Sequence, residues 1–318
     1  MSVPRLRRLT PSTTDQAAIA MSRRAARRRA LRGVPWVLAV PALLAMLLIR
    51  VAPSIAGGVY AFTNWNGTGL LNARWVGLSN FISIFHSSVT SDAFVHTFEL
   101  AGLLVVLANV FGLLLALSLR QSLKTRTLLR ALFFLPFALS QLATAYIWQF
   151  IFQYSGPLND VLRGVGLSSW QRTWLADSST ALFGVLVVIV WQFIGLTMII
   201  YLAGLQGISE ELDDAAAVDG ASAWMKFRRI TFPLIAPAIT VSTTLTLVFG
   251  LGAFEQVIAL TGGGPVNVTE TLATQVYKNT FVYGNFGYGA AFALMLAAIV
   301  TVLALTQVAV LRWREARL

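Results

Sequence analysis

The chain has 318 residues, of which 57% are hydrophobic and 12% are charged, and its net charge is +11. A soluble globular domain carries about 25% charged residues, so the composition argues against a soluble protein and indicates a surface that faces lipid. The absence of cysteine excludes disulfides and thiolate metal sites. His86 and His96 do not have a metal-binding spacing, so we expect exposed loop histidines and no metal site.

We predict an all-α integral membrane protein with six transmembrane helices, because long uncharged runs recur along the chain. Each run holds the roughly 20 apolar residues that cross a bilayer as a helix. The runs are continuous rather than alternating, which favours helices over a barrel. Residues 1–32 are expected to form a disordered basic tail before a transmembrane domain over 33–318. The expected spans are about 34–62, 95–119, 128–152, 178–202, 234–254 and 286–311.

The basic residues are unevenly distributed along this pattern. Nineteen of the 24 lysines and arginines lie in four segments: nine before the first span, four between the second and third, three between the fourth and fifth, and three after the sixth. By the positive-inside rule we expect these segments, and both termini, to be cytoplasmic. We therefore interpret the basic tail as an orientation signal, and no nucleic-acid partner is expected.

The loop between the fourth and fifth spans, residues 209–233, is the most informative segment. Ser209 suits a helix N-cap and is followed by acidic residues, which the helix dipole favours in a first turn. Gly220 is a natural stop for this helix. A second short helix is expected over about 222–230, and Pro233 suits the start of the next span. We therefore predict a helix–glycine–helix elbow whose small residues let another protein approach closely.

This elbow resembles the EAA loop of ABC importer permeases, in which Glu-Ala-Ala is followed by Gly and then by Ile and Pro. The matching residues are Asp214, Ala215, Ala216, Asp219, Gly220, Phe227, Ile230 and Pro233. Asp214 replaces the usual Glu and keeps its charge on a shorter side chain. The resemblance implies a coupling helix that docks in a cleft of an ATP-binding subunit. The alternative is an ordinary amphipathic linker.

Weaker motifs extend the resemblance over most of the chain and point to the sugar-importing branch, with its maltose-type and glycerol-phosphate-type permeases. They lie at 61–65, 76–81, 133–136, 156–159, 260–265 and 269–271. The glycine-rich turn Gly262, Gly263, Gly264 and Pro265 is not a phosphate-binding loop, because no Lys-Ser/Thr follows it. The resemblance places this turn near the docking surface for an external solute-binding protein.

Polar and aromatic residues inside the spans are candidates for a carbohydrate pathway, because polar groups are costly in a membrane and sugars bind aromatic faces and amides. The candidates are Gln141, Trp148, Gln149, Trp191, Gln192, Phe254, Glu255 and Gln256. We expect Glu255 and Gln256 to end the fifth span. The alternative is that these side chains form hydrogen bonds between helices or lie at the membrane interface.

The resemblance implies a type I ABC importer permease fold in a bacterial inner membrane, importing a carbohydrate by alternating access. It also implies three kinds of partner: a second homologous permease, two ATP-binding cassette subunits that bind ATP and Mg²⁺, and an extracytoplasmic solute-binding protein. No cofactor, catalytic residue or enzyme activity is expected in this chain, since it shows no catalytic constellation. The alternative function is a standalone secondary transporter or channel.

Overall fold

The structure is a computed structural model, and it describes residues 39–69, 73–120 and 124–317. The expected basic tail, residues 1–32, lies outside the described residues. The chain divides into two compact units, Met1–Ala56 and Gly57–Leu318.

The first unit contributes the beginning of the first predicted span. Its described residues form α2 (Val40–Met46), the π-helical turn η2 (Leu47–Val51) and the first residues of α3 (Ala52–Tyr60). Pro41 lies in the first turn of α2, where its missing N–H removes no intrahelical hydrogen bond. An uninterrupted helix of 21 residues therefore runs through Val40–Tyr60.

The second unit consists of helices joined by turns and short loops, and the predicted all-α class is confirmed. After α3, the elements in chain order are α4 (Ser79–His86), α5 (Ser88–Arg120), α6 (Arg126–Ala138), α7 (Gln141–Ile151), α8 (Pro157–Gly164), η4 (Ser168–Trp170), α9 (Ala181–Gln206), α10 (Glu210–Val218), α11 (Ala223–Lys226), η5 (Phe227–Thr231), α12 (Phe232–Leu234), α13 (Ala236–Leu251), α14 (Glu255–Leu260), α15 (Leu272–Tyr277), η6 (Lys278–Val282) and α16 (Phe286–Glu315).

Four helices of the described residues are long and apolar enough to cross a membrane: Val40–Tyr60, α5, α9 and α16. Two bent pairs raise the number to six. They are α6 with α7, bent by 98°, and Ala223–Leu234 with α13, bent by 70°. The third span is therefore not the continuous helix that the sequence predicts, whereas the bend of the second pair lies at the start of the predicted fifth span, before α13.

The break in the third span has a local cause. Pro136 lacks an N–H near the end of α6, and Leu139 adopts an extended conformation after it. Ser140 then caps α7, its hydroxyl accepting a hydrogen bond from the N–H of Ala143 at 3.1 Å. The amide of Gln192, on α9, donates to the carbonyl oxygen of Leu139 at 3.0 Å. A neighbouring helix thus satisfies the backbone group that the break leaves free.

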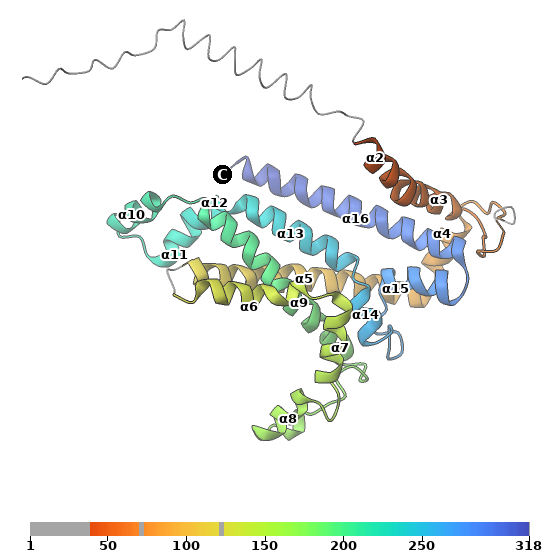
Figure 1. Cartoon of the computed structure of the whole chain (residues 1–318), viewed down its shortest axis with the longest axis horizontal. Helices are drawn as coiled ribbons and strands as arrows, with labels where there is room; N and C mark the ends of the chain where they lie inside the picture. The colour runs from red at the N-terminus through yellow and green to blue at the C-terminus, as the bar shows by residue number, and fades with distance from the viewer. Residues whose placement is uncertain (1–38, 70–72, 121–123, 318) are drawn as a thin grey trace, which may run out of the picture. The chain divides into compact units, whose positions relative to one another are not determined.

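Helix α9 is the centre of the second unit. In the most apolar 18-residue stretch of each helix, 67% of the residues of α9 are buried, compared with 6% in α16. It lies beside α5 and α13, which in turn lies beside α16 (Figure 1). Gly195 allows α6 to come close, because a Cβ there would lie 2.8 Å from the Cα of Phe134. Because so little of α16 is buried, its surface is available to lipid or to another subunit.

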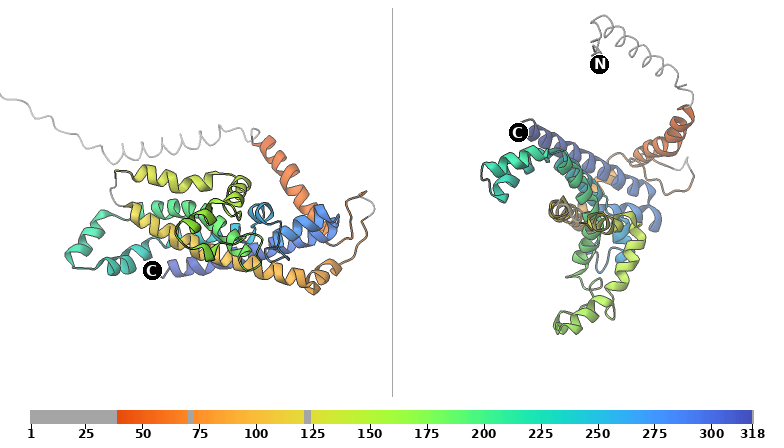
Figure 2. Two further views of the ribbon diagram at one scale, coloured as in Figure 1. Left: turned by 90° about the horizontal axis from the view of Figure 1, so that it is seen from below. Right: turned by 60° about the vertical axis from the view of Figure 1, so that its left-hand side comes forward.

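The two ends of this bundle carry different structures. One end holds α10, α11 and the chain's C-terminal residues, and the other holds α14, α15 and the loop between them (Figure 1). The further views in Figure 2 show that α10 and α11 project from the helical bundle. Both ends contain residues singled out by the sequence, so the candidate sites lie along the length of the bundle.

Candidate functional site

The polar segment after α9 folds as the predicted elbow. Helix α10 ends in a Schellman motif, in which the N–H of Ala221 donates to the carbonyl of Ala216 at 2.9 Å. Gly220 supplies the left-handed residue of this motif, with a φ of 68°. Among the described residues, no atom lies within 4 Å of the position that a Cβ on Gly220 would occupy. The turn therefore requires glycine for its backbone conformation and not for packing.

The second arm of the elbow leads into the fifth span. Ser222 caps α11, its hydroxyl accepting from the N–H of Met225 at 3.3 Å. Helical structure continues through η5 and α12 to the bend before α13. Pro233 lies within α12, three residues before the start of α13. The second arm of the elbow is thus joined to the fifth span by helical structure with a single 70° bend.

Large apolar side chains are exposed on the elbow, although the surrounding segment is polar. Val218 is 88% exposed and Trp224 is 68% exposed. With Leu212 and Met225, which are also exposed, they form what we call the elbow surface. The same segment carries exposed carboxylates and arginines: Glu211, Asp214, Asp219, Arg228 and Arg229. An exposed apolar patch with a polar rim is typical of a protein-binding surface.

The predicted coupling residues differ in their accessibility. Asp214, Ala215, Asp219 and Gly220 are exposed, whereas Ala216 is buried. Phe227, Ile230 and Pro233 are half-buried. The four residues of the elbow surface were not among the sequence-based candidates. Their signal in the sequence was the presence of large apolar side chains inside a charged loop.

A second candidate site is a cleft of about 510 Å³ among α7, α9, α13 and α14, which we call the polar cleft. Its polar side chains are those of Ser140, Gln141, Glu255 and Gln256, and Phe193 and Phe249 provide aromatic faces. The amide of Gln256 is buried and donates to the amide oxygen of Gln192 at 3.0 Å. Hydrogen-bonding groups beside aromatic faces suit a hydroxyl-rich solute.

The structure brings together three of the eight pathway candidates at this cleft. Gln192 supports it from behind, through its hydrogen bond to Gln256. The other four candidates do not line the cleft: Trp148, Gln149, Trp191 and Phe254. Trp148 and Trp191 instead pack edge to face, with ring centroids 5.5 Å apart. Glu255 and Gln256 begin α14, so the expectation that they end the fifth span is wrong.

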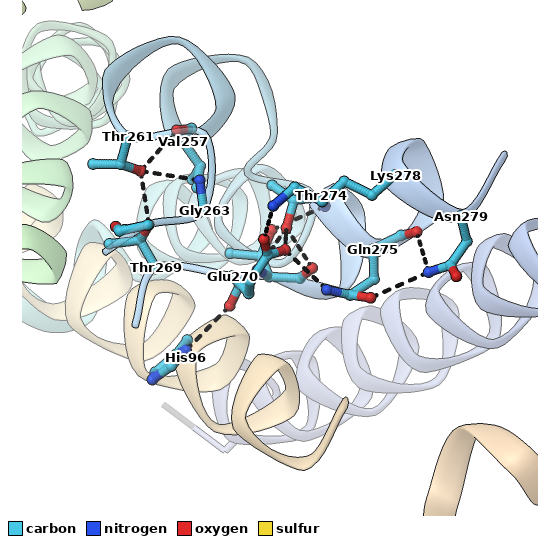
Figure 3. A network of polar contacts seen from close by, with 12 residues as sticks. His96, Val257, Thr261, Gly263, Thr269, Glu270, Thr274, Gln275, Lys278 and Asn279 are labelled. Atoms are coloured by element: carbon cyan, nitrogen blue, oxygen red, sulfur yellow. Dashed lines mark hydrogen bonds and ion pairs between the residues drawn. The ribbon is translucent and has the colours of Figure 1, made fainter. Parts of the chain in front are cut away.

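At the other end of the bundle, Glu270 is fully buried in a polar network (Figure 3). Its carboxylate forms an ion pair with Lys278 and accepts hydrogen bonds from the hydroxyl of Thr274 at 2.6 Å and the amide of Gln275 at 3.0 Å. The carbonyl of Glu270 also contacts Nδ1 of His96 at 3.2 Å. These partners satisfy a charge that would otherwise be costly to bury.

The network fixes the turn formed by Gly262, Gly263, Gly264 and Pro265, which we call the glycine turn. A Cβ on Gly263 would collide with the carboxylate of Glu270, and Gly263 has a φ of 91°. The hydroxyl of Thr269 donates to the carbonyl of Gly264 at 2.8 Å. Val266, directly after the turn, is 88% exposed. The buried carboxylate thereby supports the glycine turn from the inside, at this end of the bundle.

The two histidines differ from each other. His86 is exposed at the end of α4, whereas His96 is half-buried in α5 and contacts Glu270. The expectation of exposed loop histidines is therefore wrong for His96. Among the described residues, no group of three or more His, Asp or Glu side chains could hold a metal ion.

Four to six candidate spans among the described residues, a projecting elbow and a polar cleft within the bundle are consistent with a membrane transport permease. The family model of the binding-protein-dependent transport system inner membrane component matches residues 108–315, more than half of the chain. The chain belongs to this family. The matched region includes the elbow, the polar cleft and the glycine turn.

Relatives of similar length support this assignment. The chain is 33% identical over 283 residues to the probable starch degradation products transport system permease protein AmyD of Thermoanaerobacterium thermosulfurigenes, covering 88% of this chain and 94% of the relative. It is 32% identical over 273 residues to the multiple sugar-binding transport system permease protein MsmF of Streptococcus mutans, covering 86% and 93%.

The fold also matches a solved structure. A chain of a bacterial ABC transporter involved in the import of the acidic polysaccharide alginate superposes with a TM-score of 0.76. The match covers 92% of this chain and 98% of that chain at 23% sequence identity. The predicted ABC importer permease fold is therefore confirmed.

Proposed function

We propose that this chain forms half of the translocation pathway of an ATP-driven carbohydrate importer. Its relatives include permeases named for starch degradation products and for multiple sugars, at 33% and 32% identity. The observation that carries the proposal is the elbow surface, which offers exposed apolar side chains on a helical arm joined to a membrane span. A standalone transporter would have no need for such a docking surface.

The elbow transmits the movement of an ATP-binding subunit to the membrane. Asp214, Asp219 and the elbow surface contact that subunit, and ATP-driven closure displaces α10. The displacement passes through α11, η5 and α12 to α13, whose Val248 and Phe249 line the polar cleft. Movement of α13 therefore changes the shape of the cleft, as alternating access requires.

The polar cleft is the part of the pathway that contacts the carbohydrate. The side chains of Gln141 and Glu255 hydrogen-bond to hydroxyl groups, and Phe249 contacts the apolar face of a sugar ring. Gln256 is held in place by Gln192. Trp148, Gln149, Trp191 and Phe254 shape the surrounding helices without contacting the solute in this proposal.

The assembly follows from the two ends of the bundle. The elbow and both termini lie in the cytoplasm of a bacterial cell, and the glycine turn docks a solute-binding protein outside the inner membrane. A second homologous permease completes the pathway, and two ATP-binding cassette subunits bind ATP and Mg²⁺. This chain contributes no nucleotide site and catalyses no reaction.

Reconstitution in proteoliposomes tests this function. Purified chain alone should give no carbohydrate flux. The chain with its partner permease, the ATP-binding subunits and the solute-binding protein should give uptake that requires ATP. Carbohydrate flux through the chain alone, or uptake by the assembly that is independent of ATP, would contradict the proposal.

A further inference from the structure

A cleft of about 430 Å³ opens where α5 ends, α6 begins and α9 ends, and we call it the arginine cleft. It is separate from the polar cleft and shares no lining residue with it. Its cationic side comes from Arg120, Arg126 and Arg130, and its apolar side comes from Leu202 and Leu205. The described part of the chain therefore places three guanidinium groups together at one end of the bundle, over the buried Leu202 and Leu205.

Two of the three arginines of this cleft, Arg126 and Arg130, have no carboxylate partner among the described residues. Arg130 donates from Nη2 to the carbonyl of Leu119 at 3.0 Å, which holds its guanidinium at the end of α5. Its Nε is buried and makes no hydrogen bond to the residues that the structure describes. Cations held together in this way favour an anion between them.

The form of the cleft indicates the chemistry of that anion. Guanidinium groups match the oxygens of a phosphate, to which they donate parallel hydrogen bonds. A free phosphate would use the arginines alone, whereas a phospholipid presents a phosphate and acyl chains together and would also use apolar surface nearby. Basic pockets between transmembrane helices bind anionic lipid head groups in the same way.

The neighbouring surface suits acyl chains. The helices α5, α6 and α9 also form an apolar cleft of about 500 Å³ further along their length. Leu115, Phe133 and Ile194 are part of its lining. The helices that supply the arginines therefore also offer a path for hydrocarbon, and the ends of α5 and α9 place the arginines at the limit of the apolar spans.

We infer that the arginine cleft binds the phosphate of an anionic phospholipid, with its acyl chains along α5, α6 and α9. This goes beyond the transport function and does not depend on which solute the protein carries. It requires only that the chain lies in a membrane.

The test is a binding titration of the purified full-length chain in neutral detergent. Short-chain phosphatidylglycerol is compared with phosphatidylcholine of the same chain length, and native mass spectrometry counts the bound lipid. Phosphatidylglycerol should bind more tightly, and Arg126→Gln should weaken its binding roughly fivefold. The double variant R126Q/R130Q should weaken it roughly twentyfold or more. Arg163→Gln, on the exposed surface of α8, is the matched control and should leave binding unchanged.

Arg126 is exposed and its side chain makes no hydrogen bond to the described residues, so its variant keeps the test valid even if loss of the Arg130 contact to Leu119 impairs folding. Equal binding of both lipids, or unchanged phosphatidylglycerol binding in R126Q, would overturn the inference. Inorganic phosphate distinguishes the source of the anion. It should not displace phosphatidylglycerol, and displacement at equal concentration would assign the cleft to a soluble anion instead.

Discussion

The side-chain amide of Gln256 donates a hydrogen bond to the amide oxygen of Gln192 at 3.0 Å, which joins α14 to α9. Gln192 donates in turn to the carbonyl of Leu139 at the break between α6 and α7. One buried side chain thus connects three segments around the polar cleft. This relationship explains how polar residues inside the membrane serve the fold as well as the proposed pathway.

Gln192→Leu should destabilise the protein, because it leaves the carbonyl of Leu139 and the amide of Gln256 without partners. The expected loss is about 1–3 kcal/mol, the cost of burying an unsatisfied polar group. The midpoint of thermal unfolding in detergent measures it. Gln149→Leu is the control, since Gln149 is half-buried on α7 and its side chain makes no hydrogen bond among the described residues. Equal midpoints for the two variants would contradict the bridging role.

Glu270→Gln should lower the stability of the protein more than Gln192→Leu does, because it leaves Lys278 charged and unpaired beside a buried amide. Breaking one partner of a buried ion pair costs about 3–5 kcal/mol. The double variant E270Q/K278M should recover part of this loss, since it removes the uncompensated charge as well. Glu99→Gln, at an exposed position on α5, is the control for the substitution itself. If the double variant is less stable than E270Q alone, the ion pair is not the cause.

Gly220→Val should uncouple transport from ATP hydrolysis while leaving the protein in the membrane. A β-branched residue in the left-handed conformation costs about 1–3 kcal/mol, which disfavours the turn after α10. Gly220→Asn should retain most transport, because asparagine tolerates this conformation. Solute uptake per ATP hydrolysed in proteoliposomes measures the effect. Equal uptake in both variants would show that the glycine conformation is not needed for coupling.

Asp177 provides a pH-dependent contribution just before α9. Its carboxylate accepts hydrogen bonds from the backbone N–H of Ser179 at 2.9 Å and from the Ser179 hydroxyl at 2.8 Å. These bonds, the backbone one foremost, lower the pKa of Asp177 below its ordinary value of 3.8. The folded protein therefore favours the charged form, and the added stability is present above the ordinary pKa and lost as the pH falls through the folded one.

The difference in thermal midpoint between the wild type and Asp177→Ala measures this contribution. It should be present at neutral pH and should narrow as the pH falls below 3.8. A difference that stays constant across this range would show that the charged carboxylate does not support the start of α9.

The sequence predicted well those features that depend on residues close to one another along the chain. Gly220 ends α10 because a left-handed turn needs glycine, and this requirement is visible in the chain itself. The bend of the third span was missed because Leu139 and Ser140 lie inside a long uncharged run. Its local signals, Pro136 and the capping Ser140, were present but were outweighed by hydrophobicity.

Features that depend on distant residues could not be predicted. His96 and Glu270 are separated by 174 positions, and Gln192 and Gln256 by 64. Their contacts exist only because α5 and α9 pack against the segments that follow α13. A polar residue in a span therefore indicates a site or a structural contact, and the packing decides between them.

Single-cysteine crosslinking tests docking at the elbow most directly, because the natural chain contains no cysteine. Val218 on the elbow and Val266 beside the glycine turn are both 88% exposed, so they form a matched pair at opposite ends of the bundle. In the assembled importer, Val218→Cys should crosslink to the ATP-binding subunit and Val266→Cys to the solute-binding protein. Crosslinking of Val266→Cys, but not Val218→Cys, to the ATP-binding subunit would contradict the account.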